Sequence, residues 1–216
     1  MIKGVIFDLD GVLVSTDEMH FKAWQMLAME LGISNFTKED NKRQKGVSRS
    51  ESLEVVLEKS TNVYSEEEKL EFAERKNNYY IELLKGLSEE AVLPHVIDTL
   101  KMLRKQGTLI GIGSVSKNTP LILEKTELTQ YIDQVSCGLD ITKSKPDPEV
   151  FLVAAKKLNL KNEECLVVED SAAGVVAAKA AHMKSIGVGP EYLLLGADYE
   201  SFDLQSNVDW ETIIKN

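Results

Sequence analysis

The sequence predicts an α/β protein with a doubly wound, mainly parallel sheet and an inserted helical domain, and three observations lead to this prediction. A short apolar run at residues 2–7 ends abruptly in two acids and a glycine, as a buried parallel strand does. Residues 15–93 carry helical patterns and almost no strand pattern. From residue 94 onward, strand-like apolar runs alternate with helical segments, which is typical of a sheet with helices on both faces.

Length and composition allow one core with a smaller insert and exclude several classes of partner. The 216 residues can bury a substantial core, and 43% hydrophobic with 28% charged residues is ordinary for a globular protein. A net charge of −10 argues against nucleic acid or an anionic membrane as a partner, because both require a basic surface. With neither a secretory pattern nor a membrane-length apolar run, we expect a cytoplasmic monomer. Cys137 and Cys165 lie in apolar runs, and we expect both to be small buried hydrophobes.

The first predicted strand, at residues 2–7, is followed by Asp8 and Asp10. Because side chains of an extended segment alternate in direction, these two acids leave the strand on the same side, while Leu9 faces away. Carboxylates this close raise each other's pKa unless a cation or a hydrogen bond intervenes, which favours a site for a hard metal ion. The alternative is a turn in which an aspartate caps the next helix.

Four helices are predicted between residues 16 and 92, which we assign to the helical domain; residues 1–15 and 93–216 then form the core. Asp17 is a candidate cap for the first helix, which ends at Gly32, and a second helix is expected at 37–43. Each of the last two helices begins with a capping box, a serine followed three residues later by a glutamate: Ser48 with Glu51, and Ser65 with Glu68.

The core segments alternate regularly after the insert. A helix is expected from Pro94, at the favoured first helical position, to Gly107. Further strands are expected at residues 108–113, 134–137, 165–168 and 185–188, with helices at 119–123, 148–158, 171–181 and 210–214. This order predicts a doubly wound, Rossmann-like sheet.

Polar groups follow three further strands at the same edge of the predicted sheet. Ser114 ends one strand, and Ser116, Lys117 and Asn118 come next at a helix start, where free backbone N–H groups favour an anion. Solvated helix caps are the alternative explanation for these residues.

Lys145 lies in a loop bracketed by prolines, and Glu169 and Asp170 follow the strand at 165–168. A surface loop and a capped helix start are the alternatives here. Taken together, four carboxylates, a hydroxyl and two lysines meet at the edge where open α/β sheets bind ligands. This set suits a Mg²⁺ ion, a phosphoryl group and a carboxylate nucleophile.

Four motifs resemble, in their order and spacing, those of the haloacid dehalogenase superfamily: FDLDG at 7–11, Ser114, SKPDP at 144–148 and ED at 169–170. The resemblance implies a haloacid-dehalogenase-like core with an α-helical cap between the first two motifs. More narrowly, the whole chain resembles the β-phosphoglucomutase family, with matches at His20 and Trp24, at 45–49, at 75–77 and at 114–118, where only Val115 departs from the pattern.

The resemblance implies a role for each acid of the first and last motifs. Asp8 is implied as the nucleophile that forms an aspartyl-phosphate, and Asp10 as the general acid and base toward the sugar hydroxyl. Mg²⁺ is implied to bind the Asp8 side chain, the Asp10 backbone carbonyl and Asp170, with Glu169 beside it.

Two phosphate sites are also implied. Ser114 and Lys145 hold the transferring phosphoryl group, whereas the other phosphate contacts Arg49 of the cap and the core residues Ser116, Lys117 and Asn118. Contact with the sugar, or support of Asp10, is implied for His20, Trp24, Lys45, Gly46, Val47, Ser48 and Lys76. Without the resemblance, core packing or a solvated surface explains these cap residues equally well.

The implied activity is a Mg²⁺-dependent phosphomutase that interconverts β-D-glucose 1-phosphate and β-D-glucose 6-phosphate through β-glucose 1,6-bisphosphate. The two groups of cationic residues agree with a phosphomutase, because its bisphosphate binds in two orientations and therefore needs two phosphate sites. A sugar-phosphate phosphatase of the same superfamily is the first alternative. A receiver-like signalling module is the second, although it requires neither the insert nor Asp10. We expect the hinge between cap and core at residues 14–17 and 93–94. The sequence departs from the family pattern there, because it has Ser15 where the family usually has an acid.

Overall fold

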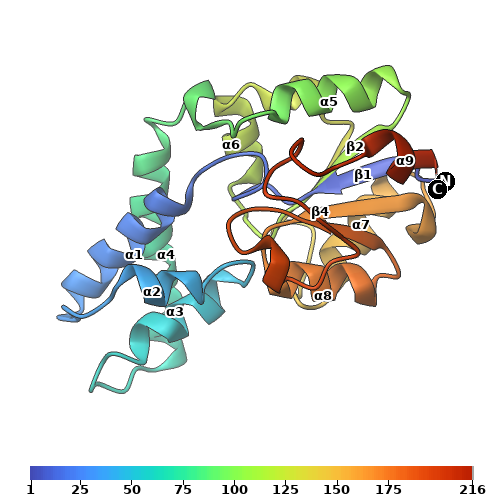
Figure 1. Ribbon diagram of the computed structural model, residues 1–216. Coiled ribbons are helices and arrows are strands. Elements are labelled where there is room, and N and C mark those ends of the chain that lie inside the picture. The colour runs from blue at the N-terminus through green and yellow to red at the C-terminus, as the bar shows by residue number, and fades with distance from the viewer. Residues whose placement is uncertain (216) are drawn as a thin grey trace.

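The computed structural model describes residues 1–215, and within them six parallel strands form one sheet in the order β3-β2-β1-β4-β5-β6 (Figure 1). Their bounds are β1 Gly4–Phe7, β2 Leu109–Gly113, β3 Gln134–Ser136, β4 Cys165–Glu169, β5 Lys184–Gly187 and β6 Tyr199–Glu200. β1 lies in the middle, hydrogen-bonded to β2 on one side and to β4 on the other. β2, β1 and β4 are therefore neighbours. They lead to Ser114, to the first acid pair and to the second acid pair, respectively.

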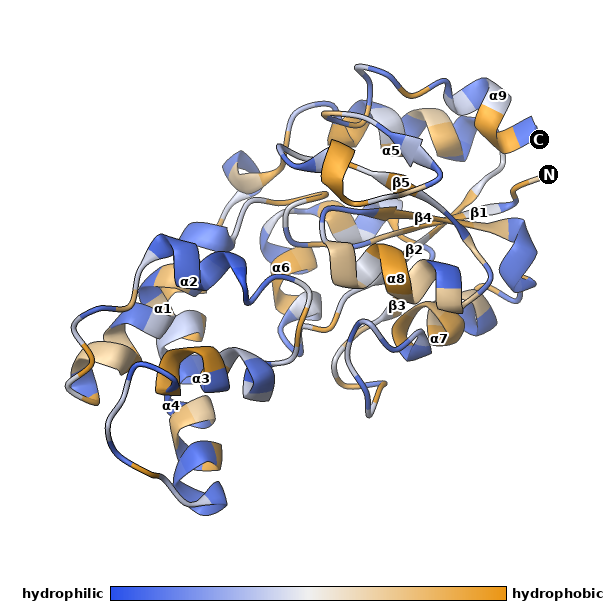
Figure 2. Ribbon diagram, turned by 60° about the horizontal axis from the view of Figure 1, so that its bottom comes forward, coloured by the Kyte–Doolittle hydropathy of each residue, from blue (hydrophilic) through white to orange (hydrophobic). Residues whose placement is uncertain are grey.

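Successive side chains of β1 point to opposite faces of the sheet, and each face has its own apolar cluster. Val5 and Phe7 pack into one apolar cluster, and Ile6 packs into the other. The helices α7 (Glu149–Lys157) and α8 (Ala172–Ala180) cover the Ile6 face. The opposite face is covered by α5 (Val96–Lys105), α6 (Thr119–Lys125) and α9 (Trp210–Lys215). The apolar strands thus lie between helical layers, as Figure 2 shows, and the predicted fold class is confirmed.

Between β1 and α5 the chain forms four helices that extend away from the sheet, and we call residues 16–92 the cap (Figure 1). They are α1 Asp17–Glu30, α2 Lys38–Lys42, α3 Arg49–Leu57 and α4 Glu66–Leu84. Trp24, Leu53 and Phe72 belong to an apolar cluster of the cap's own. The division at 15/16 and 92/93 stays a prediction, and residue 216 of the predicted core lies outside the described residues.

The cap joins the core through two adjacent segments. The Ser15 N–H donates to the Ala91 carbonyl at 2.8 Å, and the Leu93 N–H donates to the Leu13 carbonyl at 3.0 Å. Val14 and Val92 form an isolated antiparallel bridge between these bonds. Both connections therefore cross at one place, which is where a hinge between cap and core has to lie.

Two expected helix starts are wrong. Thr16, and not Asp17, occupies the N-cap of α1, and no side chain caps this helix, because the Thr16 hydroxyl donates to Asp10 instead. α5 begins at Val96, after His95 in a left-handed conformation (φ 66°). Pro94 therefore lies in the turn before the helix. In both places, contacts near the hinge override the local preference of the sequence.

The remaining segments are short. Single-turn 3₁₀ helices occur at Glu89–Ala91, Leu128–Tyr131, Asn162–Glu164 and Tyr192–Leu194. Cys137 and Cys165 are free and buried, as predicted. None of the helices within residues 1–215 has the combination of length and apolar content that crossing a membrane requires.

Candidate active site

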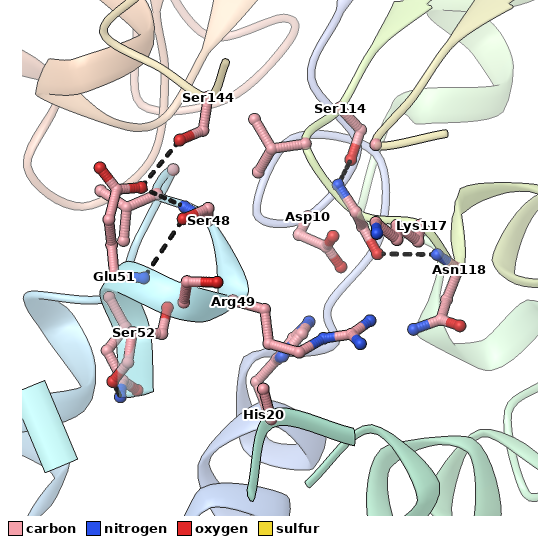
Figure 3. A pocket seen from close by; sticks show the side chains of 18 of the residues that line it. Asp10, His20, Ser48, Arg49, Glu51, Ser52, Ser114, Lys117, Asn118 and Ser144 are labelled. Carbon is pink, nitrogen blue, oxygen red and sulfur yellow. Dashed lines mark hydrogen bonds between the residues drawn. The ribbon is translucent and has the colours of Figure 1, made fainter. Parts of the chain in front are cut away.

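A cavity of about 930 Å³ lies between the carboxyl ends of the strands and the cap (Figure 3). Most of the predicted site residues line it: Asp8, Asp10, His20, Trp24, Lys45, Gly46, Val47, Ser48, Arg49, Lys76, Ser114, Ser116, Lys117, Asn118 and Asp170. Lys145 and Glu169 are fully buried behind the wall of the cavity. The fold thus brings residues from distant parts of the chain into one place.

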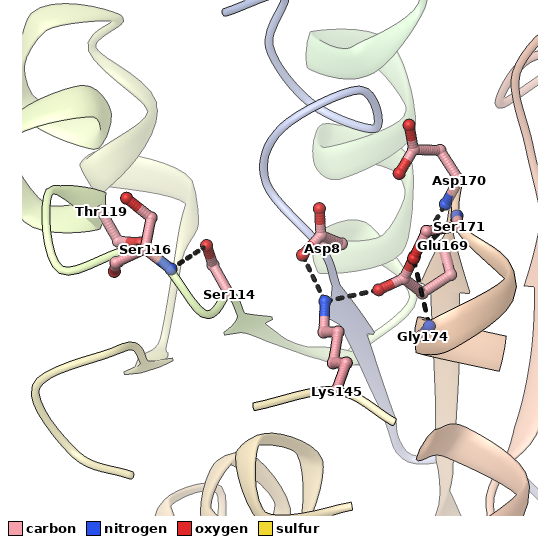
Figure 4. A network of polar contacts seen from close by, with 9 residues as sticks. All are labelled: Asp8, Ser114, Ser116, Thr119, Lys145, Glu169, Asp170, Ser171 and Gly174. Carbon is pink, nitrogen blue, oxygen red and sulfur yellow. Dashed lines mark hydrogen bonds and ion pairs between the residues drawn. The ribbon is translucent and has the colours of Figure 1, made fainter. Parts of the chain in front are cut away.

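Lys145 bridges two buried carboxylates at the end of β1 and β4 (Figure 4). Its Nζ donates to Asp8 Oδ1 and to Glu169 Oε1, both at 2.5 Å. Burial alone lowers the pKa of Lys145, but the two carboxylates outweigh it and raise that pKa above its usual range. Lys145 is therefore a permanent cation beside Asp8, as the binding of a phosphoryl group requires.

Glu169 uses both of its carboxylate oxygens within the protein. Oε1 accepts from Lys145, and Oε2 accepts from the backbone N–H groups of Asp170 and Ser171, each at 3.0 Å, and from the Ser171 hydroxyl at 2.9 Å. An added Cβ at Gly174 of α8 would lie 1.9 Å from this carboxylate, so only glycine fits there. Glu169 thereby fixes Lys145 and the backbone that carries Asp170.

The acids Asp8 and Asp170 carry unfavourable charge when no cation lies between them. Burial raises the pKa of Asp8 well above its usual value, and the neighbouring carboxylates raise it further against the opposing effect of Lys145. Burial and the charge of Glu169 likewise raise the pKa of Asp170 to about 6. A divalent cation would relieve this repulsion, so the donor set fits one.

The Asp170 carboxylate lies close to the backbone that follows Asp10. An added Cβ at Gly11 would lie 2.1 Å from Asp170 Oδ2, which means that this carboxylate lies against the backbone that follows Asp10. Among residues 1–215, no group of three His, Cys, Asp or Glu side chains is placed to hold a metal ion. The set implied by the resemblance combines two side chains, Asp8 and Asp170, with the Asp10 backbone carbonyl, and it stays a prediction.

Asp10 has different surroundings from Asp8. Its side chain lines the cavity and accepts a hydrogen bond from the Thr16 hydroxyl at the start of the cap. Loss of hydration raises the pKa of Asp10 to about 6, although the Thr16 bond opposes the shift. A carboxyl group with a pKa near neutrality exchanges protons readily at physiological pH, as a general acid and base must.

Lys76 is enclosed by aromatic side chains of the cap. Its Nζ lies 2.9 Å from His20 Nδ1, 4.6 Å from the centre of the Trp24 ring and 4.8 Å from that of Tyr80. Burial, and then the charge of Arg49, lower the pKa of Lys76 to about 7. Loss of hydration and Lys76 also lower the pKa of His20 well below its usual value, so the imidazole is neutral. Trp24 belongs to the cap's apolar cluster and lines the cavity as well.

The loop after β2 turns its polar groups toward the cap. The Ser116 N–H donates to Ser114 Oγ, and the Asn118 N–H donates to Ser116 Oγ, both at 3.2 Å. Figure 3 shows Arg49 extending from the cap side toward Asn118. Lys117 lies on this loop as well and is exposed. Cationic groups therefore face one end of the cavity from both cap and core.

Direct contacts hold the cap against the core. Lys45 Nζ lies 3.0 Å from Asp170 Oδ2, and Ser144 Oγ donates to Glu51 Oε2 at 2.7 Å. An added Cβ at Gly46, whose φ is 73°, would lie 2.6 Å from the Ser171 hydroxyl. Glycine at 46 thus permits both the turn and the close approach, and the cap contacts the core beside the site.

The comparisons with known proteins agree with this geometry. A family model for haloacid dehalogenase-like hydrolases matches residues 5–188. The chain belongs to this family. β-Phosphoglucomutase of Bacillus subtilis is 39% identical over 199 residues, which cover 91% of this chain and 88% of that protein. The crystal structure of β-phosphoglucomutase from Clostridium difficile has a TM-score of 0.91 and 35% identity, and the match covers 100% of this chain and 96% of that one.

A phosphatase is also among the relatives. The phosphorylated carbohydrates phosphatase of Thermotoga maritima is 30% identical over 188 residues, which cover 86% of this chain and 84% of that protein. Together these findings confirm that this haloacid dehalogenase-like protein is an enzyme and a homologue of β-phosphoglucomutase. The resemblance that the four motifs predicted is therefore correct.

Sequence reasoning missed several side chains of this haloacid dehalogenase-like site. Thr16 binds Asp10, and Asn77 accepts hydrogen bonds from Arg49 and Asn118. Tyr80 stacks on His20 with 3.9 Å between the ring centres. The helical spacing from Lys76 to Tyr80 places both on one face of α4, which is the one signal that could have found Tyr80. Asn77 lies within the family match at 75–77, but nothing in its helical position indicates its two bonds, and nothing in the sequence sets Thr16 apart from an ordinary N-cap.

Proposed function

We propose that this enzyme is a Mg²⁺-dependent phosphomutase that interconverts β-D-glucose 1-phosphate and β-D-glucose 6-phosphate through β-glucose 1,6-bisphosphate. The observation that carries the proposal is a cavity between cap and core with cationic side chains at each end. One end lies at Asp8, Ser114 and Lys145, and the other lies between Arg49 and the loop after β2. A bisphosphate fills both ends, and it fills them equally well after turning around.

In the proposed reaction, a carboxylate oxygen of Asp8 attacks the phosphorus atom of the phosphate held at Ser114 and Lys145. The bond between phosphorus and the sugar oxygen breaks, and Asp10 gives its proton to that oxygen. In the return step Asp10 removes the proton from the other sugar hydroxyl, which takes the phosphoryl group back from Asp8. The Asp8 and Asp170 side chains and the Asp10 carbonyl would hold a Mg²⁺ ion, which would supply positive charge to the phosphoryl oxygens.

Contacts between cap and core support transfer to sugar over transfer to water. The hydrogen bond from Ser144 to Glu51 and the ion pair between Lys45 and Asp170 hold the cap against the core beside the cavity. Excluding solvent protects a reactive aspartyl-phosphate from hydrolysis. The monomeric state and the cytoplasmic location stay predictions from the sequence.

The phosphatase relative makes sugar-phosphate hydrolysis the competing function. One assay distinguishes the mutase from the phosphatase. The purified enzyme receives β-glucose 1-phosphate, Mg²⁺ and a trace of β-glucose 1,6-bisphosphate, and glucose 6-phosphate and inorganic phosphate are measured together. We expect glucose 6-phosphate to form much faster than phosphate is released, and α-glucose 1-phosphate to be a poor substrate. Faster release of phosphate would overturn the proposal in favour of the phosphatase.

A further inference from the structure

Asn77 lies on α4 of the cap, half-buried at the boundary with the core. Its side-chain oxygen Oδ1 accepts two hydrogen bonds from different parts of the molecule. Arg49 Nη2 donates to it at 2.8 Å from the start of α3, and Asn118 Nδ2 donates to it at 2.9 Å from the loop after β2. Asn77 is thus a direct link between cap and core inside the cavity.

The two donors are the same groups that face the second phosphate in the proposed function. A phosphate oxygen accepts hydrogen bonds from guanidinium and amide N–H groups at the same distances. Oδ1 of Asn77 therefore holds Arg49 and Asn118 together as an anion would, without supplying a charge. When a phosphate arrives, both donors already point to a common position.

The neutrality of Asn77 matters because Arg49 is partly buried and its charge is poorly hydrated. Burial lowers the pKa of Arg49, and among the acids of residues 1–215 only the exposed Glu74 opposes this effect. A carboxylate at position 77 would form an ion pair with Arg49 and repel an incoming phosphate. An amide fixes the direction of the guanidinium and leaves its charge available to the substrate.

We infer that Asn77 is a positioning residue for the second phosphate, and that it couples closure of the cap to occupation of that end of the cavity. The inference rests on the proposed function, since it assumes a substrate with two phosphate groups. It assigns Asn77 no contact with the reacting atoms. The effect of substituting Asn77 should therefore depend on whether the substrate carries a phosphate at the end of the cavity away from Asp8.

The test compares two phosphoryl donors in the Asn77→Ala and Asn77→Asp variants. β-Glucose 1,6-bisphosphate fills both ends of the cavity, whereas acetyl phosphate fills only the end at Asp8. Asn78→Ala and Asn78→Asp are matched controls, because Asn78 is the next residue of α4 and is exposed. The rate of Asp8 phosphorylation is measured against the concentration of each donor, and thermal denaturation checks that each variant is folded.

We expect Asn77→Ala to raise the KM for the bisphosphate roughly tenfold, because Arg49 and Asn118 lose the hydrogen bonds that hold them in place for the phosphate. Asn77→Asp should raise it further, because its charge repels the phosphate. The rate constant with acetyl phosphate should change less than twofold in both variants, and the Asn78 variants should match the wild type with both donors.

Equal losses with both donors in Asn77→Ala would overturn the inference, because they would indicate a general structural role. An unchanged KM for the bisphosphate would overturn it as well. If Asn77→Asp does not fold, the alanine variant still decides the outcome. If the wild type converts the bisphosphate only to inorganic phosphate, the proposed function fails, whereas the comparison of the two donors still tests the role of Asn77.

Discussion

At the scale of single residues, the charge on Lys145 stabilises both the site and the fold. Its ammonium group is fully buried and contacts only Asp8 and Glu169 among charged groups of the described residues. Removing one member of a buried ion pair leaves an uncompensated charge, which costs about 3–5 kcal/mol. The same side chain is proposed to hold the transferring phosphoryl group, so stability and activity depend on one atom.

We therefore predict that Lys145→Ala lowers the free energy of unfolding by about 3–5 kcal/mol and abolishes phosphorylation of Asp8. Urea denaturation and phosphoenzyme labelling measure the two effects. Lys156→Ala is the control, because Lys156 of α7 is exposed and lies outside the cavity. Wild-type stability of Lys145→Ala would contradict the buried ion-pair network.

A second prediction concerns the proton of Asp10. Its pKa of about 6 lies above the usual value because of lost hydration, and the Thr16 hydroxyl lowers it by binding the ionised carboxylate. Asp10 must be ionised to accept the sugar proton, so the rate of phosphoryl return should fall tenfold per pH unit below about 6.

Thr16→Val removes the hydrogen bond and raises the pKa of Asp10, so the acid limb of the kcat profile should move to higher pH. Thr99→Val is the control, since the Thr99 hydroxyl is buried without a hydrogen-bond partner and lies away from the cavity on α5. An acid limb that stays in place in Thr16→Val would show that Asp10 does not set it.

At the scale of elements, α3 and α4 of the cap begin with the same serine–glutamate capping box, but of the two capping glutamates only that of α3 bonds the core within residues 1–215. Glu51 closes the capping box of α3 and also accepts from Ser144 of the core. Glu68 closes the capping box of α4 and bonds only Ser65. Comparing variants of Glu51 and Glu68 therefore distinguishes the effect of helix capping from the effect of the contact between cap and core.

We predict that Glu51→Ala and Glu68→Ala each lower the free energy of unfolding by roughly 0.5–1.5 kcal/mol, as loss of a cap does. Glu51→Ala should in addition increase the share of phosphoryl groups lost to water several-fold, because the closed cap is weakened. The ratio of inorganic phosphate to glucose 6-phosphate measures this share. Identical ratios in the two variants would exclude a role of the Ser144–Glu51 bond in closure.

The elements also show which parts of the fold a sequence can predict. Both serine–glutamate capping boxes and five of the six strands were predicted correctly, because capping and apolar runs act through neighbouring residues, whereas the two-residue strand β6 was missed. The starts of α1 and α5 were wrong, because Thr16 and Leu93 form bonds to segments that lie close only in the folded chain. Asn77 was missed for the same reason, since both of its partners are distant in sequence.

At the scale of the whole molecule, the site is a source of electrostatic strain that a bound cation would relieve. Asp8 and Asp170 have raised pKa values in the folded chain, mainly through burial, so their ionised forms destabilise it as pH rises above the ordinary carboxyl range. The proposed Mg²⁺ would compensate both charges. Removing it should therefore reduce the stability of the fold at neutral pH.

We predict that Mg²⁺ at a hundredfold excess over its Kd stabilises the enzyme at pH 7.5 by about 2.7 kcal/mol relative to enzyme in EDTA. Asp170→Asn should lose most of this response, whereas Asp140→Asn, outside the cavity, should keep it. Thermal denaturation at several Mg²⁺ concentrations measures the difference. An equal response in Asp170→Asn would place the metal elsewhere.

The central claim is that a phosphoryl group on Asp8 returns to a sugar in preference to water. Enzyme labelled with ³²P on Asp8 is mixed with β-glucose 1-phosphate and Mg²⁺ and quenched within one turnover. We predict that the label appears in β-glucose 1,6-bisphosphate before any inorganic phosphate, and that Asp8→Asn takes up no label. Label released directly as inorganic phosphate, at the same rate with and without the sugar phosphate, would contradict the account.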